Sequence, residues 1–241
     1  MSTRQGTLYA VGIGPGDPDL LTVKAVKTLQ AVDVVFAAAS PKNDHSLALS
    51  IAAPHLRPGV PVRRLDFPMT RDSAILAKAW HDNARAVLEA LDAGQDAAFL
   101  TLGDPMTYST CGYLLRTLHG LAPDARVEVV PGVTSYQAAA ALARQPLAEA
   151  GESLVILSGI RQAEDLRRGL EAADNAVILK AYRNFPAIAQ ALREVGAGGS
   201  ALLVSECGLP GQTVARGLDE CPEQPPYLSL LLVKRGKAGQ E

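Results

Sequence analysis

The chain has 241 residues, enough for one large domain or two small ones, and its 48% hydrophobic and 20% charged residues are typical of a globular protein. A formal net charge of −2, without an arginine- or lysine-rich tract, argues against a nucleic-acid or membrane partner. The three cysteines form no CxxC pair and no apolar run is long enough to span a bilayer, so we expect a cytoplasmic protein with neither a bound metal nor a disulfide framework.

Short apolar runs alternate with amphipathic segments along the first half of the chain. Thr22 is a candidate helix N-cap, and Gly94 and Gly120 are candidate helix ends. The pattern predicts strands over 8–13, 34–39, 60–67 and 97–102, and helices over 22–31, 47–55, 73–93 and 108–119. Alternation of strand and helix predicts a mostly parallel sheet that is covered on both faces.

The second half has a different rhythm, and we place the domain boundary near Pro123-Asp124, which gives domains 1–122 and 123–241. The pattern predicts strands over 127–130, 154–157, 176–179, 201–205 and 227–233, and helices over 135–144, 162–173 and 186–195. The last strands follow one another closely, so we expect some antiparallel pairing and a mixed sheet. The sequence therefore predicts an α/β protein with two α/β domains.

A glycine-rich loop, GIGPGDP at 12–18, follows the first predicted strand. It differs from the dinucleotide-binding fingerprint because its third glycine comes one residue early and its prolines remove two amide donors. The acidic residue expected about twenty positions later, Asp33, precedes the second strand instead of ending it. The loop therefore does not fit a dinucleotide site, and from the residues alone a rigid turn built from glycine and proline is as good an interpretation as a ligand-binding loop.

The same loop, read on as GIGPGDPDLLT, resembles the opening loop of the tetrapyrrole (cobalamin and sirohaem) methyltransferases. Four further segments resemble that family in the same order: LGDP at 102–105 with YST at 108–110, VPGVTS at 130–135, LKAYRN at 179–184 and SECGLP at 205–210. The resemblance spans nearly the whole chain. It implies a class III methyltransferase-like fold with an S-adenosylmethionine-binding cleft between the two domains, and a homodimer.

Two details resemble the members that methylate C20 of the macrocycle: YST at 108–110, and FPMTRD at 67–72 followed by Trp80. The implied substrate is precorrin-2 or cobalt-factor II of cobalamin biosynthesis, with the presence of cobalt left open. The alternatives are methylation at C11, C17 or C2/C7, diphthine chemistry on a protein, or a non-catalytic module that binds tetrapyrrole or S-adenosylmethionine.

The resemblance also implies which residues bind the cosubstrate, largely through backbone groups. One wall of the cleft would hold Pro15, Gly103, Asp104 and Thr107, and the other Thr134, Ser135, Lys180, Ala181 and Gly208. Asp104 has three interpretations, because it could cap its turn, orient a ligand or act as a general base. Capping or orientation is favoured, since in-line methyl transfer mainly requires that donor and acceptor are positioned.

A substrate that carries carboxylates needs basic partners. The candidates are Arg63, Arg64, Arg71, Arg161 and Arg183, although each is also a common type of solvated surface residue. Tyr108 could pack against the macrocycle or belong to the core. The histidines, His55 among them, share no metal-ligand spacing and are interpreted as ordinary surface or helix residues.

Overall fold

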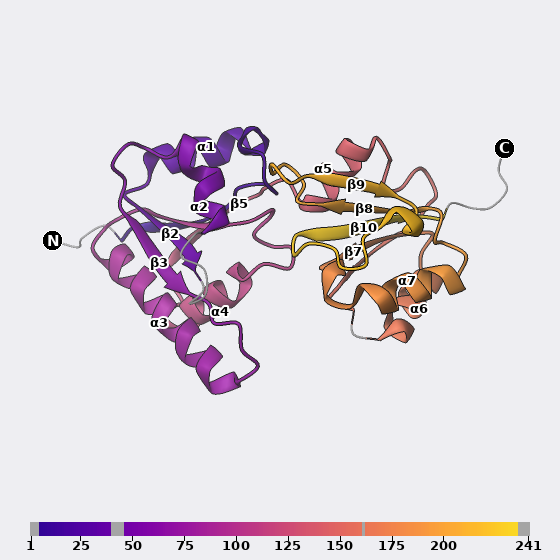
Figure 1. The fold of residues 1–241 in the computed structure, drawn as a ribbon. Coiled ribbons are helices and arrows are strands. Elements are labelled where there is room, and N and C mark those ends of the chain that lie inside the picture. Colours follow the sequence, from indigo (N-terminus) through magenta and orange to yellow (C-terminus); the bar gives the residue numbers. More distant parts are fainter. Residues whose placement is uncertain (1–4, 40–45, 161, 236–241) are drawn as a thin grey trace. The chain divides into compact units, whose positions relative to one another are not determined.

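The computed structural model describes residues 5–39, 46–160 and 162–235 (Figure 1). The chain forms two compact units, Met1–Thr134 and Ser135–Glu241. Each unit is a β-sheet with helices packed on both of its faces, as the alternation of strand and helix predicts.

The sheet of the first unit has five strands in the order β3-β2-β4-β1-β5, and every neighbouring pair is parallel. Its strands are β1 (Thr7–Gly12), β2 (Val34–Ala39), β3 (Val62–Asp66), β4 (Ala97–Thr101) and β5 (Arg126–Val130). The predicted parallel sheet is confirmed. All five residues of β4 are buried, as expected for a central strand that is covered on both sides.

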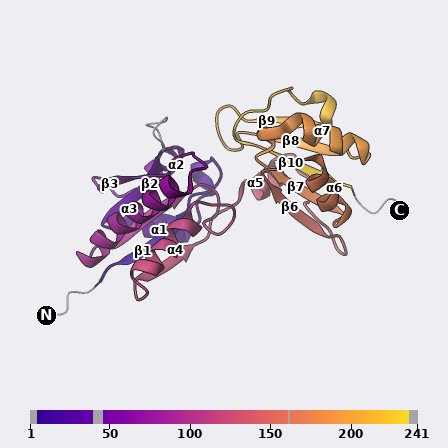
Figure 2. The ribbon, with the colours of Figure 1, turned by 90° about the horizontal axis from the view of Figure 1, so that it is seen from below.

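Four helices cover this sheet: α1 (Val23–Ala31), α2 (Leu47–Ala52), α3 (Ser73–Asp92) and α4 (Cys111–Leu121). Helices α1 and α2 pack on one face, and α3 and α4 pack on the other (Figure 2). Thr22 caps α1 as predicted, because its hydroxyl oxygen accepts from the Ala25 N–H. Gly120 does not end α4; the Ala122 N–H still bonds to the Leu118 carbonyl, so the helix continues beyond it.

Strand β5 joins the first sheet, although the sequence rhythm places it in the second half of the chain. It pairs with β1 from Thr7↔Arg126 to Val11↔Val130. The chain consequently divides after Thr134 and not near residue 122. The rhythm of apolar residues identifies a strand but does not say which sheet the strand completes.

The sheet of the second unit is mixed, as predicted, with the order β6-β7-β10-β8-β9. Only β6 and β7 pair in parallel; the other three neighbouring pairs are antiparallel. Its strands are β6 (Leu154–Ser158), β7 (Asn175–Leu179), β8 (Ala201–Ser205), β9 (Thr213–Arg216) and β10 (Ser229–Lys234). The short, largely exposed edge strand β9 was not predicted, because it lacks the apolar run of its neighbours.

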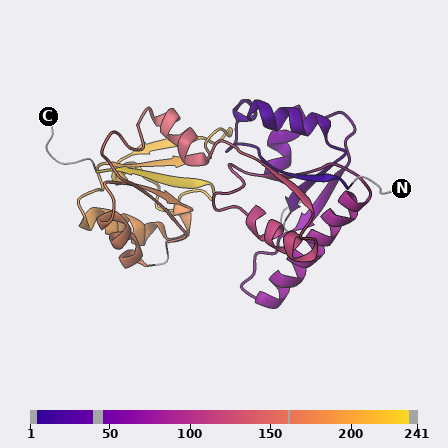
Figure 3. The ribbon, with the colours of Figure 1, turned by 180° about the vertical axis from the view of Figure 1, so that it is seen from behind.

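Helix α5 (Ser135–Ala143) covers one face of this sheet, and α6 (Ala163–Glu171) and α7 (Phe185–Glu194) cover the other (Figure 3). Short 3-10 helices occur at η1 (Pro18–Leu20), η2 (Ala53–His55), η3 (Ala181–Asn184) and η4 (Leu218–Glu220). In the described ranges, no helix combines the length and the apolar character that a membrane crossing requires.

Candidate functional site

The carboxyl ends of β4, β1 and β5 are neighbours in the first sheet, and open α/β sheets commonly bind ligands at such an edge. We call residues 12–15, 103–108 and 132–134, which follow these strand ends, the first strand-end cluster. The Ile13 N–H donates to the Thr101 carbonyl at 3.0 Å. Gly14 and Gly103 then form an isolated antiparallel bridge, in which the Gly103 N–H donates to the Gly14 carbonyl at 2.7 Å.

The main chains of three glycines meet in this cluster, and at two of them, Gly12 and Gly132, no side chain would fit. A Cβ on Gly12 would lie 2.6 Å from the Gly132 nitrogen and 2.7 Å from the Gly103 carbonyl oxygen. A Cβ on Gly132 would overlap the same carbonyl oxygen. Gly103 itself has φ +66° and an open side, where a Cβ would meet only Val133 and Thr134 atoms at 3.9 Å. Backbone groups therefore form a close-packed wall with one open position.

Asp104 joins two loops of this cluster. Its Oδ1 accepts from the Met106 N–H at 2.9 Å and from the Thr107 hydroxyl at 3.4 Å. Its Oδ2 accepts from the Gly132 N–H at 3.1 Å. Both carboxylate oxygens thus hold main-chain groups, one in the aspartate's own turn and one in the loop after β5.

The loop after β1 is held by further polar contacts. His55 of η2 places its Nε2 3.1 Å from the Pro18 carbonyl, and the Asp17 carboxylate accepts from the Asp19 N–H at 2.9 Å. The Thr22 hydroxyl donates to the Pro131 carbonyl at 3.4 Å. The contact of His55 depends on tertiary packing, and no spacing in the sequence indicates it.

Tyr108 follows the Asp104 turn in a conformation that is unfavourable for a bulky side chain. Its φ is +50°, and the residue is 55% exposed, so it does not belong to the core. The next residue, Ser109, accepts from the Cys111 N–H at 3.0 Å and bonds to the Thr101 hydroxyl at 2.7 Å. Burial, and to a smaller extent the charge of Asp104, raises the pKa of the Cys111 thiol to about 12.

The helices that follow the two segments with C20-like details, α3 and α4, pack against each other within the first unit. Trp80 of α3 stacks on Tyr113 of α4 with ring centroids 4.6 Å apart and an interplanar angle of 10°. The Arg116 guanidinium lies 5.0 Å from the centroid of the Tyr113 ring. The stack therefore connects the helix after FPMTRD with the helix after YST.

The predicted basic residues of the first unit do not converge on one point. Arg63 and Arg64 are successive residues of β3, so their side chains point to opposite faces of the sheet. Arg63 lies 5.5 Å from the Phe36 ring centroid and 3.9 Å from a Glu89 oxygen. Arg71 is exposed just before α3, and Arg161 lies outside the described residues.

The second unit also gathers strand ends at one edge of its sheet. Strands β7 and β8 are both antiparallel to β10, so their carboxyl ends lie at the edge where β10 begins. We call residues 180–183, 206–208 and Tyr227, which lie at these ends, the second strand-end cluster. The Glu206 N–H donates to the Leu228 carbonyl at 2.8 Å, and the Gly208 N–H donates to Gln212 Oε1 at 2.8 Å.

Non-glycine residues with positive φ mark both clusters. Among the described residues they are Tyr108, Lys180, Glu206 and Arg144, with φ between +50° and +58°. Arg144 follows the end of α5, where a left-handed residue commonly closes a helix. The other three follow strand ends in segments that resemble the family, and backbone strain of this kind is frequently found at functional sites.

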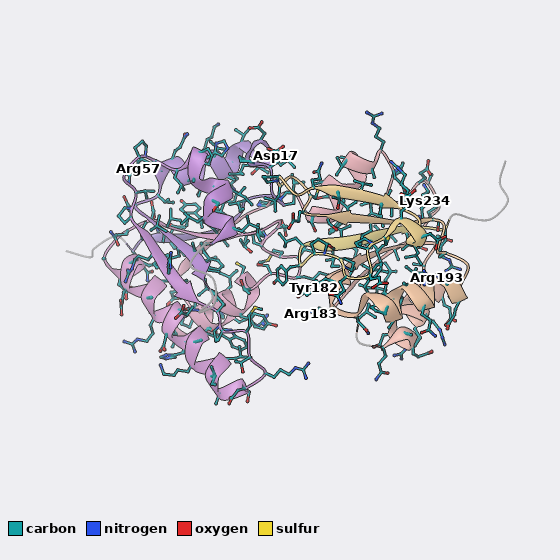
Figure 4. The ribbon with its side chains drawn as sticks, in the orientation of Figure 1. Asp17, Arg57, Tyr182, Arg183, Arg193 and Lys234 are labelled. Atoms are coloured by element: carbon teal, nitrogen blue, oxygen red, sulfur yellow. The ribbon has the colours of Figure 1, made fainter. Side chains whose placement is uncertain are left out.

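Lys180, Tyr182, Arg183 and Tyr227 form the side-chain part of the second cluster. Arg183 Nε donates to the Tyr182 hydroxyl oxygen at 2.9 Å, and the two residues lie side by side in Figure 4. The rings of Tyr182 and Tyr227 are 4.8 Å apart at 48°. Desolvation, followed by the charge of Arg183, lowers the pKa of Lys180, although much of the lysine remains accessible to solvent.

The predicted cosubstrate residues thus fall into two groups. Pro15, Gly103, Asp104, Thr107 and Thr134 lie in the first cluster, Lys180, Ala181 and Gly208 lie in the second, and Ser135 begins α5. Within the described ranges, no three His, Cys, Asp or Glu side chains are grouped as metal ligands would be.

Residues 7–220 match the family model of tetrapyrrole (corrin/porphyrin) methylases. The chain is 38% identical over 232 residues to a cobalt-precorrin-2 C(20)-methyltransferase of Salmonella typhimurium, covering 95% of this chain and 97% of the relative. It is 33% identical to a precorrin-2 C(20)-methyltransferase of Sinorhizobium, covering 95% of each. Among solved structures, a uroporphyrin-III C-methyltransferase from Thermus thermophilus in complex with S-adenyl homocysteine has a TM-score of 0.67 and 26% identity, covering 95% of this chain and 92% of that chain.

Proposed function

The chain belongs to the tetrapyrrole (corrin/porphyrin) methylase family, and we propose that it transfers a methyl group from S-adenosylmethionine to C20 of precorrin-2, or of its cobalt-containing counterpart, in cobalamin biosynthesis. The observation that carries the proposal is the similarity, along 95% of the chain, to two relatives that are both named for C20 methylation. These relatives differ in whether their named substrate contains cobalt. The metal content of the substrate is therefore a question for experiment.

The first strand-end cluster fits a cosubstrate that is held by backbone groups. The open side of Gly103, beside the Val133 carbonyl and Thr134, offers space against main chain that no side chain of the cluster fills. S-adenosylmethionine supplies an activated methyl group, which leaves its sulfur when an acceptor carbon attacks in line. The role of the protein in such a transfer is to hold both reactants in a reactive geometry.

We assign the cosubstrate contacts to residues of both clusters. Those of the first unit are Pro15, Gly103, Asp104, Thr107 and Thr134; those of the second are Ser135, Lys180, Ala181 and Gly208. Because both oxygens of Asp104 already accept main-chain hydrogen bonds, we assign it an orienting role and not that of a general base.

We assign Tyr108 and Arg183 to the substrate. Tyr108 is exposed and strained beside the Asp104 turn, which favours a contact with the macrocycle. Arg183 is exposed at the end of β7. Substrate contacts by Arg63, Arg64 and Arg71 stay predictions. The structure favours them less for Arg63 and Arg64, because these two side chains point to opposite faces of the sheet.

The test is methyl transfer itself. The purified protein is incubated without oxygen with S-adenosylmethionine and precorrin-2, metal-free in one reaction and cobalt-loaded in the other. We expect a gain of one methyl group by mass and a labelled methyl signal at C20 by NMR, with the faster reaction identifying the natural substrate. Methylation at another ring position would refute the C20 proposal. A homodimer in sedimentation experiments and a cytoplasmic location are further expectations of the family resemblance.

A further inference from the structure

We propose that Arg183, held by Tyr182 and Tyr227, and the nearby Lys180 form a carboxylate-binding subsite at the carboxyl end of β7. The inference rests on the proposed function, because it concerns how the same site recognises its ligands. It changes the assignment of Lys180, whose side chain and not only its backbone would contact a ligand. Two ligands of the proposed reaction carry carboxylates, the tetrapyrrole and the methionine part of the cosubstrate, and the test below separates them.

The guanidinium of Arg183 is held in place for an anion. Its Nε donates to the Tyr182 hydroxyl at 2.9 Å, and its Cζ lies 5.8 Å from the centroid of the Tyr182 ring. This contact occupies one N–H of the group and leaves the terminal nitrogens to other partners. A guanidinium with a fixed plane loses little side-chain freedom when it binds a planar carboxylate through two parallel hydrogen bonds.

The tyrosine pair gives the subsite a firm and accessible base. Tyr182 packs against Tyr227, whose chain position just before β10 is fixed through the bond from the Glu206 N–H to the Leu228 carbonyl. Tyr227 is nevertheless 59% exposed, and Arg183 is exposed as well. A ligand can therefore reach the guanidinium without displacing a buried side chain.

The positive charges at Lys180 and Arg183 differ from other cations of the second unit in their partners. Elsewhere in the second unit, Arg167, Arg168 and Lys234 each pair with an Asp or Glu. Among the residues that the structure describes, neither Lys180 nor Arg183 has such an ion pair. The positive charge of Arg183 instead contributes to the lowered pKa of Lys180. Two neighbouring cations without a protein counter-ion favour the binding of an anion.

The backbone at Lys180 supports a functional placement of its side chain. Lys180 has φ +58°, a left-handed conformation that is unfavourable for a residue with a Cβ. The following helix η3 begins directly after it and carries Tyr182 and Arg183. The left-handed turn at Lys180 therefore places both cations at the end of the same strand.

The experiment uses Arg183→Gln, the conservative variant Arg183→Lys, and Tyr182→Phe, which removes only the hydroxyl that holds Nε. The matched control is Arg193→Gln, on α7 of the same unit, where the arginine makes a 3.9 Å surface pair with Asp219. For each variant we would measure the KM for the tetrapyrrole, the Kd of S-adenosylhomocysteine by calorimetry, and the binding of uroporphyrin III, a tetrapyrrole polycarboxylate, by fluorescence. An unchanged unfolding midpoint would show that a variant is folded.

We expect Arg183→Gln to weaken the affinity for one of the two ligands roughly ten- to hundredfold, the loss typical of a charge-assisted hydrogen bond. Arg183→Lys should recover part of that loss, and Tyr182→Phe should cost roughly three- to tenfold. Weaker binding of the tetrapyrrole with unchanged binding of S-adenosylhomocysteine would show that Arg183 binds a carboxylate of the substrate. The reverse result would show that it binds the carboxylate of the cosubstrate. The proposal is overturned if neither ligand is affected, or if Arg193→Gln has the same effect as Arg183→Gln.

Failure of the proposed function would be recognised separately. If the wild-type protein does not methylate C20, yet Arg183→Gln still weakens the binding of uroporphyrin III or S-adenosylhomocysteine, the subsite stands and the C20 proposal is refuted. If the wild type methylates C20 and Arg183→Gln leaves every affinity unchanged, the function stands and the subsite is refuted.

Discussion

The two strand-end clusters differ in the groups that form them, which are mainly main-chain groups in the first and side chains in the second. The first is built from glycine backbones that approach to within van der Waals contact, with Asp104 joining two of its loops. The second is built from long side chains on backbone in an unfavourable conformation, with Lys180 and Glu206 both at positive φ. A backbone wall recognises shape and tolerates no added atom, whereas a side-chain cluster recognises charge and can be altered step by step. We therefore expect substitutions in the first cluster to act through folding, and substitutions in the second to act through affinity.

The largest expected effect is that of Gly132→Ala. The new Cβ would overlap the Gly103 carbonyl oxygen and press on Gly12, so we expect a loss of about 2–3 kcal/mol in the free energy of unfolding and no detectable binding of S-adenosylhomocysteine. Denaturant unfolding and calorimetry measure the two effects. Gly120→Ala is the control, because its Cβ would meet no atom within 4 Å; this helical site should become more stable by about 0.5–1 kcal/mol. A Gly132→Ala protein with wild-type stability would show that the first cluster is not close-packed.

Asp104→Asn comes next and decides between the roles of Asp104. An amide keeps the shape but offers one acceptor in place of two, so one bond to Met106 or Gly132 is lost. We expect the unfolding free energy to fall by about 1–2 kcal/mol and the affinity for S-adenosylhomocysteine to fall roughly tenfold. A general base would behave differently, with kcat reduced roughly a hundredfold or more and affinity unchanged. Asp72→Asn is the control, because Asp72 caps α3 with two backbone bonds that asparagine replaces well.

Lys180→Gly tests whether strain in the second cluster serves function. Glycine adopts φ +58° without penalty, so we expect a gain of about 0.5–1 kcal/mol in stability together with weaker ligand binding. Arg144→Gly relieves the same conformation at the end of α5 and should give a similar gain with unchanged activity. Equal activity in both variants would mean that the strain at Lys180 has no functional value. Unfolding experiments and steady-state kinetics are the measurements.

The last prediction concerns the thiols of the two units, and its effect on stability is confined to alkaline pH. The pKa of Cys111 is raised from 9.0 to about 12, so between these values the unfolded chain releases a proton that the folded chain retains. The contribution of Cys111 to the free energy of unfolding is therefore fully present below pH 9 and is lost as the pH rises toward 12. Cys111→Ala should flatten this alkaline decline relative to the wild type in unfolding experiments. In thiol labelling of the folded protein, the partly accessible Cys207 should react well before the buried Cys111; simultaneous labelling would contradict the close packing behind Asp104.

Much of the fold could be predicted because its signals are local. The apolar runs at β2 and β8 were predicted with their observed bounds, and the Thr22 cap was recognised from its position before an amphipathic run. Strand β9 was missed because three of its four residues are exposed and its pattern is weak. The LGDP segment around Asp104 was noticed through its resemblance to the family, but the bond from the Gly132 N–H to Asp104 joins residues separated by 28 positions. The contact of His55 with Pro18 joins residues 37 positions apart, and no pattern in the sequence indicated it.

By itself, the sequence determined most of the elements, the parallel character of the first half and the mixed character of the second. Hydrogen bonding within an element and the rhythm of its apolar residues depend on neighbours a few positions apart. Only the tertiary structure decided that β5 completes the first sheet, that Gly12, Gly103 and Gly132 meet, and that Arg63 and Arg64 diverge while Arg183 is held by Tyr182. Strand order and side-chain direction are set by packing of the whole chain, where contacts between distant residues compete for the same edge or face. The physical division is one of range: local interactions choose the elements, and long-range packing chooses which strand ends and side chains come together.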